Sequence, residues 1–415
     1  MIRNSFVPLA QSNKKGVVLF LSNGHAEDLI ASTVIEKLSQ ECFPWEIRAL
    51  PLVGEGRAYD EIGIKVLGPR RMMPSGGFVE FNPLWLARDM ASGWLGVLRG
   101  QVGVLRKQRA ATRLVVCVGD IFLVILSVFF LKKPIVFLST AKSDYARLYK
   151  GHYLVEKWLM KWFCQLVLSR DELTTSSLRD FGINAVYVGN VMMDCLKISD
   201  EELGIGENRH VVGILPGSKE EAYKNLPIIL DAVKKISRES FLFRKTDFLL
   251  ALAASLSLKR LGEVVFSSRD WILKSSASEE KKQGIVAYLV SSPGIRIKIV
   301  EGRFADVLNS SQVIIGLSGM GNEQAVGLGK PVVSFPTEGP QITKKFLRIQ
   351  QLILGEAISI VEPKAEAVAE EVSAILSHPE KKEEALRVGK KRMGGPGAAA
   401  QVADLIKKEL GEQEW

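Results

Sequence analysis

Short apolar runs rich in β-branched residues alternate with longer amphipathic segments along most of the chain. This alternation is typical of a parallel β-sheet covered by helices, because each parallel strand needs a long crossover to reach the next one. We expect strands near 16–22, 46–50, 114–118, 134–139, 165–169, 185–188, 210–215, 247–252, 297–300, 312–315, 331–335 and 357–360. We expect helices near 27–39, 84–109, 151–163, 171–180, 224–238, 303–309, 319–327, 340–353 and 364–377. The pattern predicts an α/β chain with two Rossmann-like halves.

The chain is long enough for two separate cores, since it has 415 residues and 47% of them are apolar. The polar segment 197-KISDEELGIGENR-209 is typical of a loop between two domains. We therefore expect an N-terminal domain over 1–195 and a C-terminal domain over 205–394. After them, 394-GGPGAAAQVADLIKKEL-410 breaks at Gly-Pro-Gly and predicts an Ala-rich helix, which could be a simple surface helix.

The four cysteines have no metal-ligand spacing, and two of them lie in apolar runs. We interpret them as reduced thiols of a cytoplasmic protein and expect no zinc site. The most apolar run, 121-IFLVILSVFFL-131, is 11 residues long, whereas a membrane-spanning helix needs about 20. No secretory signal is visible at the N-terminus. The expected location is the cytoplasm or, as a peripheral protein, the inner face of the membrane.

The net charge of +9 lies mostly in the first half, where residues 1–190 hold 24 Lys and Arg against 16 Asp and Glu. Residues 65–113 are strongly basic and carry interleaved aromatic residues, among them Trp85 and Trp94. Such a mixture suits the headgroup layer of an anionic membrane, and 153-YLVEKWLMKWF-163 has the same character. An amphipathic helix packed on its own domain is the alternative. Nucleic acid is not expected, because no recognition motif accompanies the charge.

A glycine-rich turn lies in 311-SQVIIGLSGMGNEQAVGLGKPVVSF-335, between an expected strand and an expected helix. Small residues let the backbone approach a ligand, and the free N–H groups of a helix start attract an anion such as a diphosphate. Glu323, one turn into the helix, is placed to hold ribose hydroxyls. An ordinary turn with glycines for tight packing is the alternative. The candidate residues are Gly316, Ser318, Gly319, Met320, Gly321, Asn322, Glu323 and Gln324.

Three more polar turns follow expected strands, where ligands of open α/β sheets bind. They contain Asn23, Gly24, His25 and Glu27 in the first turn, Gly119 and Asp120 in the second, and Gly217, Ser218 and Lys219 in the third. Each has a structural alternative: His25 as a turn histidine, Asp120 as a helix cap and Lys219 as a solvated side chain. Two polar turns in each half together predict a cleft between the domains.

Several segments resemble the lipid-A-disaccharide synthase family. The run 215-LPGSKEEAYKNLP-227 is similar to the LPGSR-x-x-E turn of that family, and 318-SGMGNEQAVGLGKPVV-333 to its SGT-x-x-LE segment. The run 186-VYVGNVMMD-194 resembles the YVG-[HN]-P-x-x-D hinge, with Val191 in place of proline, and Gly119-Asp120 resembles the VGID turn. The resemblance covers nearly the whole chain in order.

The chain also departs from this family. The first turn, with Gly24-His25, looks more like the Gly-His turn of the undecaprenyl-pyrophosphoryl-muramoyl-pentapeptide N-acetylglucosaminyltransferase and the galactolipid synthases. Lys219 stands where arginine is usual, which keeps the charge but loses the bidentate fork. The acceptor loop is replaced by 138-LSTAKSDYARLY-149, so the acceptor can differ from a lipid A precursor. We therefore expect a relative of the synthase.

The resemblance implies a GT-B glycosyltransferase with two Rossmann-like domains facing across a cleft. It implies that the C-terminal domain holds a UDP-sugar donor of the N-acetylglucosamine type and that the N-terminal domain holds a lipid-linked acceptor. It also implies that the helix over 395–415 crosses back onto the N-terminal domain. Inverting transfer then needs a general base, and the hypothesis assigns this role to Asp120 or else to His25. The transfer is expected to need no metal. Ser218, Lys219 and the helix start after Gly319 would stabilise the departing UDP. Further donor contacts are assigned to Gln341 with the residues above, and acceptor contacts to Asn23, Gly24, Glu27, Trp85 and Trp94.

Two other classes of protein stay open. A UDP-sugar 2-epimerase would use the same fold and donor pocket without a lipid acceptor, and the basic aromatic region argues against it. A non-catalytic protein that binds a nucleotide sugar or a membrane is the other alternative, because Lys219 and the altered acceptor loop could belong to one.

Overall fold

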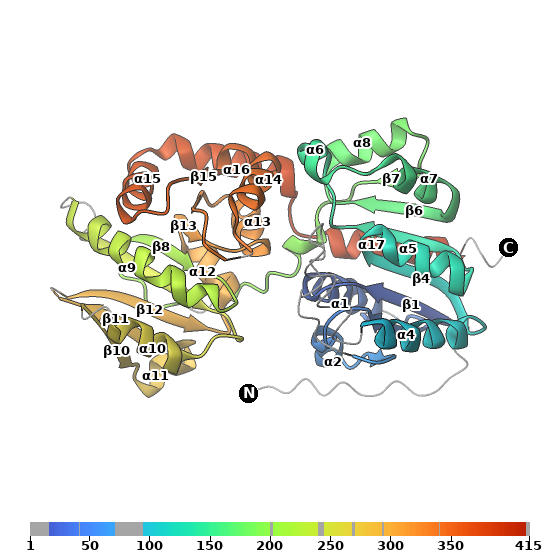
Figure 1. Ribbon diagram of the computed structural model, residues 1–415, viewed down its shortest axis with the longest axis horizontal. Coiled ribbons are helices and arrows are strands. Elements are labelled where there is room, and N and C mark those ends of the chain that lie inside the picture. The colour runs from blue at the N-terminus through green and yellow to red at the C-terminus, as the bar shows by residue number, and fades with distance from the viewer. Residues whose placement is uncertain are drawn as a thin grey trace. The chain divides into compact units, whose positions relative to one another are not determined.

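The structure, a computed structural model, describes residues 16–40, 42–70, 94–199, 202–239, 245–267, 270–292, 294–339 and 341–411. The chain divides into two compact units (Figure 1). Unit 1 comprises Met1–Lys142, His152–Val191 and Gly397–Trp415, and unit 2 comprises Ser143–Gly151 and Met192–Pro396. Each unit is built around its own β-sheet.

Unit 1 contains a seven-stranded parallel sheet in the order β3-β2-β1-β4-β5-β6-β7. Its central strands are buried on both faces, which explains why they appear in the sequence as continuous apolar runs such as VVLFLS. The strands are β1 (Val17–Ser22), β2 (Glu46–Pro51), β3 (Lys65–Val66), β4 (Thr112–Gly119), β5 (Ile135–Ser139), β6 (Cys164–Ser169) and β7 (Ala185–Val186). The expected strand positions are confirmed, and β3 is an addition to them.

The helices that accompany this sheet are α1 (His25–Ser39), α2 (Arg57–Glu61), α4 (Trp94–Gln108), α5 (Ile121–Leu126), α7 (Leu154–Phe163) and α8 (Glu172–Asp180). The apolar run 121–131 forms α5 and then a π-helical turn, η1 (Ser127–Leu131). The helix expected over 84–109 is described only from Trp94 onward, because 84–93 lie outside the described residues. The last helix, α17 (Ala398–Gly411), packs on α1 within unit 1 and buries Val402, Ile406 and Leu410.

Unit 2 contains an eight-stranded sheet in the order β10-β11-β12-β9-β8-β13-β14-β15. The strands are β8 (His210–Leu215), β9 (Thr246–Leu252), β10 (Trp271–Ser275), β11 (Ile285–Ser291), β12 (Ile295–Glu301), β13 (Val313–Gly316), β14 (Val332–Ser334) and β15 (Ile358–Ile360). This sheet is mixed, because β11 pairs antiparallel with both β10 and β12. The other pairs are parallel.

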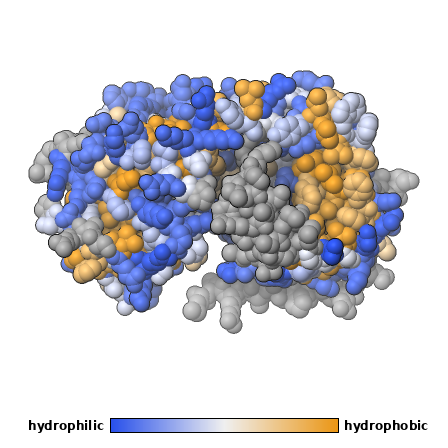
Figure 2. Space-filling model, in the orientation of Figure 1, coloured by the Kyte–Doolittle hydropathy of each residue, from blue (hydrophilic) through white to orange (hydrophobic). Residues whose placement is uncertain are grey.

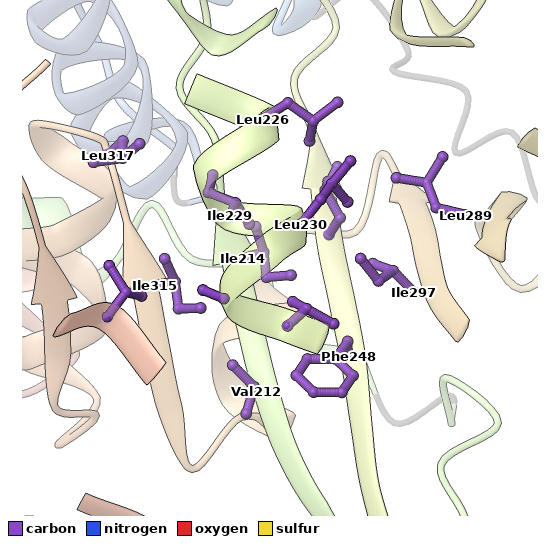
Figure 3. Packing of buried hydrophobic residues seen from close by; sticks show 14 of the residues in the cluster. Val212, Ile214, Leu226, Ile229, Leu230, Phe248, Leu289, Ile297, Ile315 and Leu317 are labelled. Carbon is purple, nitrogen blue, oxygen red and sulfur yellow. The ribbon is translucent and has the colours of Figure 1, made fainter. Parts of the chain in front are cut away.

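The helices of unit 2 are α9 (Glu221–Glu239), α10 (Leu258–Ser267), α11 (Ser278–Lys282), α12 (Phe304–Ser310), α13 (Met320–Gly327), α14 (Lys344–Leu354), α15 (Ala365–Ser377) and α16 (Pro379–Met393). The short segments η2 (Asp144–Ala146) and α6 (Arg147–Lys150) also belong to this unit. Figure 3 shows the core between α9 and the sheet, where Leu226, Ile229 and Leu230 pack toward Ile214 and Phe248. Strands β8 and β13 pair in parallel, so their carboxyl ends lie side by side.

Candidate functional site

The chain order of the unit 1 strands reverses between β1 and β4. From β1 the chain continues to β2 and β3 on one side of the sheet, and then returns to β4 on the other side. Crossover connections therefore leave in opposite directions at this point, which opens a crevice at the carboxyl ends in sheets of this kind. Register pairs Ser22 with Val118, so the turns that follow β1 and β4 lie next to each other. Those are the turns for which the sequence predicts acceptor and catalytic residues.

Asp120 caps α5 and also receives a hydrogen bond from the neighbouring turn. Its carboxylate accepts the backbone N–H of Phe122 at 2.9 Å and a hydrogen bond from the Asn23 side chain. Gly119 permits this approach: its φ is +142°, and a Cβ there would lie 1.9 Å from Asn23 Oδ1. Burial raises the pKa of Asp120, while these two hydrogen bonds and the Lys142 ammonium lower it. A carboxylate with a raised pKa is suited to accept a proton.

The other predicted residues of the first turn have different positions. His25 is the first residue of α1 and is exposed. The Glu27 carboxylate folds back over Gly24, where a Cβ would lie 2.3 Å from Glu27 Oε2. The hydrogen bond that Asp120 receives from the first turn comes from Asn23.

An ion-paired cluster beside Asp120 was not predicted from the sequence. Lys142 Nζ lies 2.8 and 2.7 Å from the two carboxylate oxygens of Glu156. The His152 ring lies between Glu156 Oε2, 3.6 Å from Nδ1, and Ser139 Oγ, 3.1 Å from Nε2. Both Lys142 and Glu156 act electrostatically on Asp120, so the cluster adjusts the charge of that carboxyl group.

A second buried carboxyl group lies beneath the first turn. Asp28 is 1% exposed and accepts a hydrogen bond from Ser22 Oγ at 2.5 Å. Ser22 Oγ in turn lies 2.6 Å from the hydroxyl of Tyr59. Burial raises the pKa of Asp28 to about 7, although the Ser22 hydroxyl opposes the shift. Asp28 is thus a structural group that titrates near neutrality.

A small cavity lies at the carboxyl ends of β5 and β6. It has a volume of about 20 Å³ and is lined by residues that include Ser139, Thr140, Ser169 and Arg170. This volume holds roughly one water molecule, which is too little for a sugar or a nucleotide. All of its lining residues belong to unit 1, and none of them is a predicted donor, acceptor or catalytic residue.

In unit 2 the strand order reverses between β8 and β13, and both predicted donor turns lie there. From β8 the chain runs outward through β9 and β12 and then returns to β13 on the other side. Gly217, with a φ of +110°, brings the β8 turn against the β13 turn, since a Cβ there would lie 3.3 Å from the carbonyl oxygen of Leu317. The Phe346 ring of α14 packs against Gly319. The two turns and the start of α14 thus share one corner of the sheet.

The glycine-rich turn is held by a network that ends on Gln350, a residue not predicted from the sequence. Gln350 Nε2 donates to the carbonyl oxygens of Gly319 at 2.9 Å and Ser318 at 3.4 Å. Gln350 Oε1 accepts from Asn322 Nδ2 at 3.0 Å, and Asn322 also donates to the carbonyl of Gly316 at 3.1 Å. The Ser318 hydroxyl accepts the N–H of Gly321 at 3.1 Å. The turn is therefore fixed by the protein itself.

Two residues that the sequence assigned to ligand contacts are committed to the fold. Asn322 is fully buried over Gly316, and Gln324 is 3% exposed and donates to the carbonyl of Met192 at 3.0 Å. The side-chain amide nitrogens of both residues donate hydrogen bonds within unit 2, that of Asn322 inside the turn and that of Gln324 to Met192. Both side chains are buried, whereas other predicted donor residues lie at the surface of this region.

The remaining predicted donor residues lie at that surface. Ser218 and Lys219 are exposed, and the Ser218 carbonyl accepts a hydrogen bond from Ser255 Oγ at 2.6 Å. Met320, Glu323 and Gln341 are half-buried, with Glu323 in the first turn of α13. Of the predicted acceptor tryptophans, Trp85 lies outside the described residues, and Trp94 is the first residue of α4.

The described part of the chain shows neither a metal-binding cluster nor a membrane-spanning helix. Within it, no group of three or more His, Cys, Asp or Glu side chains is placed to hold a metal ion. No helix of that part combines the length and the apolar character needed to span a bilayer.

Comparison with known proteins relates the chain to one curated family. No protein-family model matches the chain. A lipid-A-disaccharide synthase of Geobacter sulfurreducens is 25% identical over 254 residues, which cover 56% of this chain and 59% of the relative. The synthase of Syntrophotalea carbinolica is 26% identical over 247 residues, or 54% of this chain and 56% of the relative. The chain is a distant homologue of the lipid-A-disaccharide synthases. The matches span little more than half the length of these relatives.

Solved structures share the fold over almost the whole chain. MurG of Acinetobacter baumannii matches with a TM-score of 0.56 and 13% identity over 95% of this chain and 99% of its own. The calicheamicin glycosyltransferase CalG4 matches with 0.58 and 15% identity, covering 95% and 98%. A putative UDP-N-acetylglucosamine 2-epimerase of Listeria monocytogenes matches with 0.57 and 14%, covering 95% and 97%. The expected GT-B class is therefore confirmed as a fold that glycosyltransferases and these epimerases share.

Proposed function

We propose that this chain is an inverting glycosyltransferase that transfers a sugar, of the N-acetylglucosamine type, from a UDP-sugar to a lipid-linked acceptor. The observation that carries the proposal is the position of the polar turns. In each unit they lie at the strand-order reversal, where sheets of this kind bind ligands. The distant homology to lipid-A-disaccharide synthases supports the choice of reaction.

Unit 1 supplies the residues proposed to activate the acceptor. Transfer with inversion requires a general base that takes the proton of the acceptor hydroxyl. The hydroxyl oxygen then attacks the anomeric carbon of the sugar, and UDP leaves. Asp120 fits this role because burial raises its pKa while Asn23 and Phe122 hold its carboxylate in place. His25 is the alternative base, since it is exposed at the start of α1 beside the same reversal.

Unit 2 supplies the residues proposed to hold the donor and its leaving group. The departing UDP carries negative charge, which the N–H groups at the start of α13 and the ammonium of Lys219 can stabilise. Gln350 fixes the carbonyls of this turn, so the N–H groups need no rearrangement when charge develops. Glu323 is proposed to hold the ribose, with Ser218, Ser318 and Gln341 as further donor contacts.

A UDP-sugar 2-epimerase is the second candidate, because a putative enzyme of that class has a similar fold. Two observations favour the transferase. The curated relatives with sequence similarity are synthases. Unit 1 also exposes large apolar side chains that an enzyme acting only on nucleotide sugars does not need. Association with a membrane is proposed for the same reason.

Two measurements test the proposal. Calorimetry with UDP should give saturable binding, and incubation with UDP-N-acetylglucosamine and a panel of glycolipid acceptors should give UDP and a glycosylated lipid by mass spectrometry. Asp120→Asn is the matched control for turnover, because it keeps the shape of the side chain. Release of an epimerised sugar without acceptor would favour the epimerase, and absence of UDP binding would refute both enzymes.

A further inference from the structure

A short segment between β5 and α7 leaves unit 1 and folds with unit 2. The chain passes into unit 2 after Lys142 and returns to unit 1 at His152, so Ser143–Gly151 belongs to unit 2. We call Ser143–Gly151 the crossover segment. It contains η2 and α6 and overlaps the loop in which the sequence departs from the synthase pattern. Both residues that flank it belong to the ion-paired cluster beside Asp120.

Hydrogen bonds within the crossover segment make it a folded piece of chain. The Ser143 hydroxyl accepts the N–H of Tyr145 at 3.3 Å, and the Ser143 carbonyl accepts that of Ala146 at 3.1 Å. At the other end, the N–H of Gly151 donates to the carbonyl of Arg147 at 3.1 Å. A segment closed in this way is stiffer than an extended loop, so a displacement of its middle is carried to its ends.

The crossover segment is anchored on α14 and α16. Its η2 turn packs on α14, and the fully buried Ala146 belongs to the same apolar cluster as Ile349 and Ile353 of α14. Helix α16 is rich in charged residues, and the part of unit 2 that carries α15 and α16 in Figure 1 is largely hydrophilic in Figure 2. Arg392 of α16 is half-buried, and its guanidinium carbon lies 3.5 Å from the centroid of the Tyr145 ring. Such stacking of a cation on an aromatic ring stabilises the contact.

Helix α14 also holds the glycine-rich donor turn. Gln350 donates to the carbonyl of Gly319, and the Phe346 ring packs against Gly319. Arg392 Nη1 donates to the carbonyl of Leu352 at 3.3 Å, so the cation that stacks on the crossover segment is itself bonded to α14. The donor turn and the crossover segment are therefore attached to the same helix.

We propose that the crossover segment couples the donor turn of unit 2 to the proposed base of unit 1. A UDP-sugar that binds the donor turn would displace α14, and the segment would carry this displacement to Lys142. Lys142 Nζ lies 2.8 and 2.7 Å from the carboxylate oxygens of Glu156, and both groups act on Asp120. The coupling rests on the proposed function, because it takes the glycine-rich turn as the UDP site and Asp120 as the base.

The other groups around Asp120 lie outside the crossover segment. Asn23 donates to its carboxylate, and Glu27 lies against the neighbouring Gly119. Neither residue adjoins the segment in the chain, whereas Lys142 directly precedes it. Lys142 is therefore the group through which donor binding would change the proton affinity of Asp120. Coupling between two sites is reciprocal, so the protonation of Asp120 must change the affinity for UDP by the same factor.

This reciprocity gives a test that needs no turnover. Calorimetric titration of the full chain with UDP is repeated from about pH 5 to about pH 8. The terminal phosphate of UDP titrates in the same range, near pH 6, so Asp120→Asn is the reference that retains this contribution. The UDP affinity of the parent should change with pH by about fivefold more than that of Asp120→Asn.

Variants of the anchor test the route of the coupling. Tyr145→Ala and Arg392→Gln should remove the difference in pH dependence that Asp120→Asn makes, whereas Tyr145→Phe keeps the ring and should preserve it. Arg387→Gln, on the same helix but paired with Glu384, is the matched control and should behave as the parent does. A purely structural contact would lower the unfolding midpoint of the variants and leave that difference unchanged.

Two results would overturn the coupling. One is the same pH dependence of UDP affinity in the parent and Asp120→Asn. The other is the parent's full difference in Tyr145→Ala and Arg392→Gln when circular dichroism shows both to be folded. Transfer of the sugar together with the first result would leave the transferase standing and remove the coupling alone. Absence of UDP binding would remove both.

Discussion

The side-chain amide of Asn23, just beyond β1, donates a hydrogen bond to the carboxylate of Asp120, just beyond β4. The bond joins two turns that are far apart in the sequence and adjacent in the sheet. It also stabilises the ionised form of a carboxyl group whose pKa is raised by burial. Asn23 is therefore a positioning residue for the proposed base.

Asn23→Ala should raise the pKa of Asp120. Loss of the amide donor removes one of the interactions that favour the ionised carboxylate. Because the base must be ionised to accept a proton, the acid limb of kcat/KM against pH should move to higher pH. The pH profile of transfer in Asn23→Ala and the parent measures this shift. Asn23→Asp is unsuitable as a control because it adds charge, so Asn23→Gln serves. An unmoved acid limb in Asn23→Ala would contradict the role.

Asp120→Asn should lower kcat by roughly 100-fold or more, which is the usual contribution of a general base. The amide keeps the shape of the side chain and can still accept from the N–H of Phe122. His25→Ala tests the alternative base in the same assay. Full turnover in both variants would show that neither residue is the base.

Lys142→Gln and Glu156→Gln should shift the pKa of Asp120 in opposite directions. The ammonium of Lys142 lowers the pKa of Asp120 and the carboxylate of Glu156 raises it. Lys142→Gln should therefore shift the acid limb of the pH profile upward, and Glu156→Gln should shift it downward. If Lys142 and Glu156 only stabilise the fold, neither variant should shift the acid limb of the pH profile.

The same pair should also be coupled in stability. Both side chains are mostly buried, so removing one partner leaves an uncompensated charge and costs about 3 kcal/mol. The double variant should recover part of this loss, because it leaves neither charge unpaired. Chemical unfolding of the two single variants and the double variant completes the cycle, and strictly additive losses would speak against the coupling.

Glu323→Ala should weaken UDP binding about tenfold, as expected when a charged hydrogen-bond partner worth roughly 1.4 kcal/mol or more is lost. Lys219→Gln should weaken it as well, with a smaller effect at high salt. Glu370→Ala removes an exposed carboxylate from α15 and is the matched control. Calorimetric titration with UDP measures all three, and equal affinities in Glu323→Ala and Glu370→Ala would refute the ribose contact.

Asp28→Asn should stabilise unit 1 at alkaline pH more than at acidic pH. The pKa of Asp28 is about 7 in the folded chain and near 3.8 when unfolded, so the folded state holds the proton more strongly. Its contribution to stability is complete below about pH 4 and is lost as pH rises to about 7, in total on the order of 4 kcal/mol. The unfolding transition of unit 1 in the variant and the parent should therefore differ more at pH 8 than at pH 5. The same difference at both pH values would contradict the titration of Asp28.

The strands of both sheets could be predicted from the sequence because most are buried on both faces. The apolar runs that form β1 and β8 have no polar face to obscure them. The edge strand β10 and its neighbour β11 were not predicted, because both have fewer buried positions than β1 or β8. In β10 one side chain of the five, Trp271, is buried, and β11 alternates buried and half-buried residues. A polar edge strand resembles a loop in sequence.

The candidate site could be predicted only where its residues directly follow strands. The turns at Asn23, Asp120, Gly217 and Ser318 satisfy that condition. Lys142 and Glu156 meet across a segment that contains η2 and α6, and Gln350 reaches the glycine-rich turn from α14. No local pattern marks such pairs, because tertiary packing alone brings them together. Packing also turns Asn322 inward, over Gly316.

Helix α17 belongs to unit 1 yet follows all of unit 2 in the chain. It supplies Val402, Ile406 and Leu410 to the layer beside α1. During synthesis the ribosome therefore releases every strand of unit 1 long before the helix that completes its packing. Unit 2 can therefore fold completely while one side of α1 is still without its packing partner. Unit 1 therefore completes its folding after unit 2, although most of unit 1 is synthesised first.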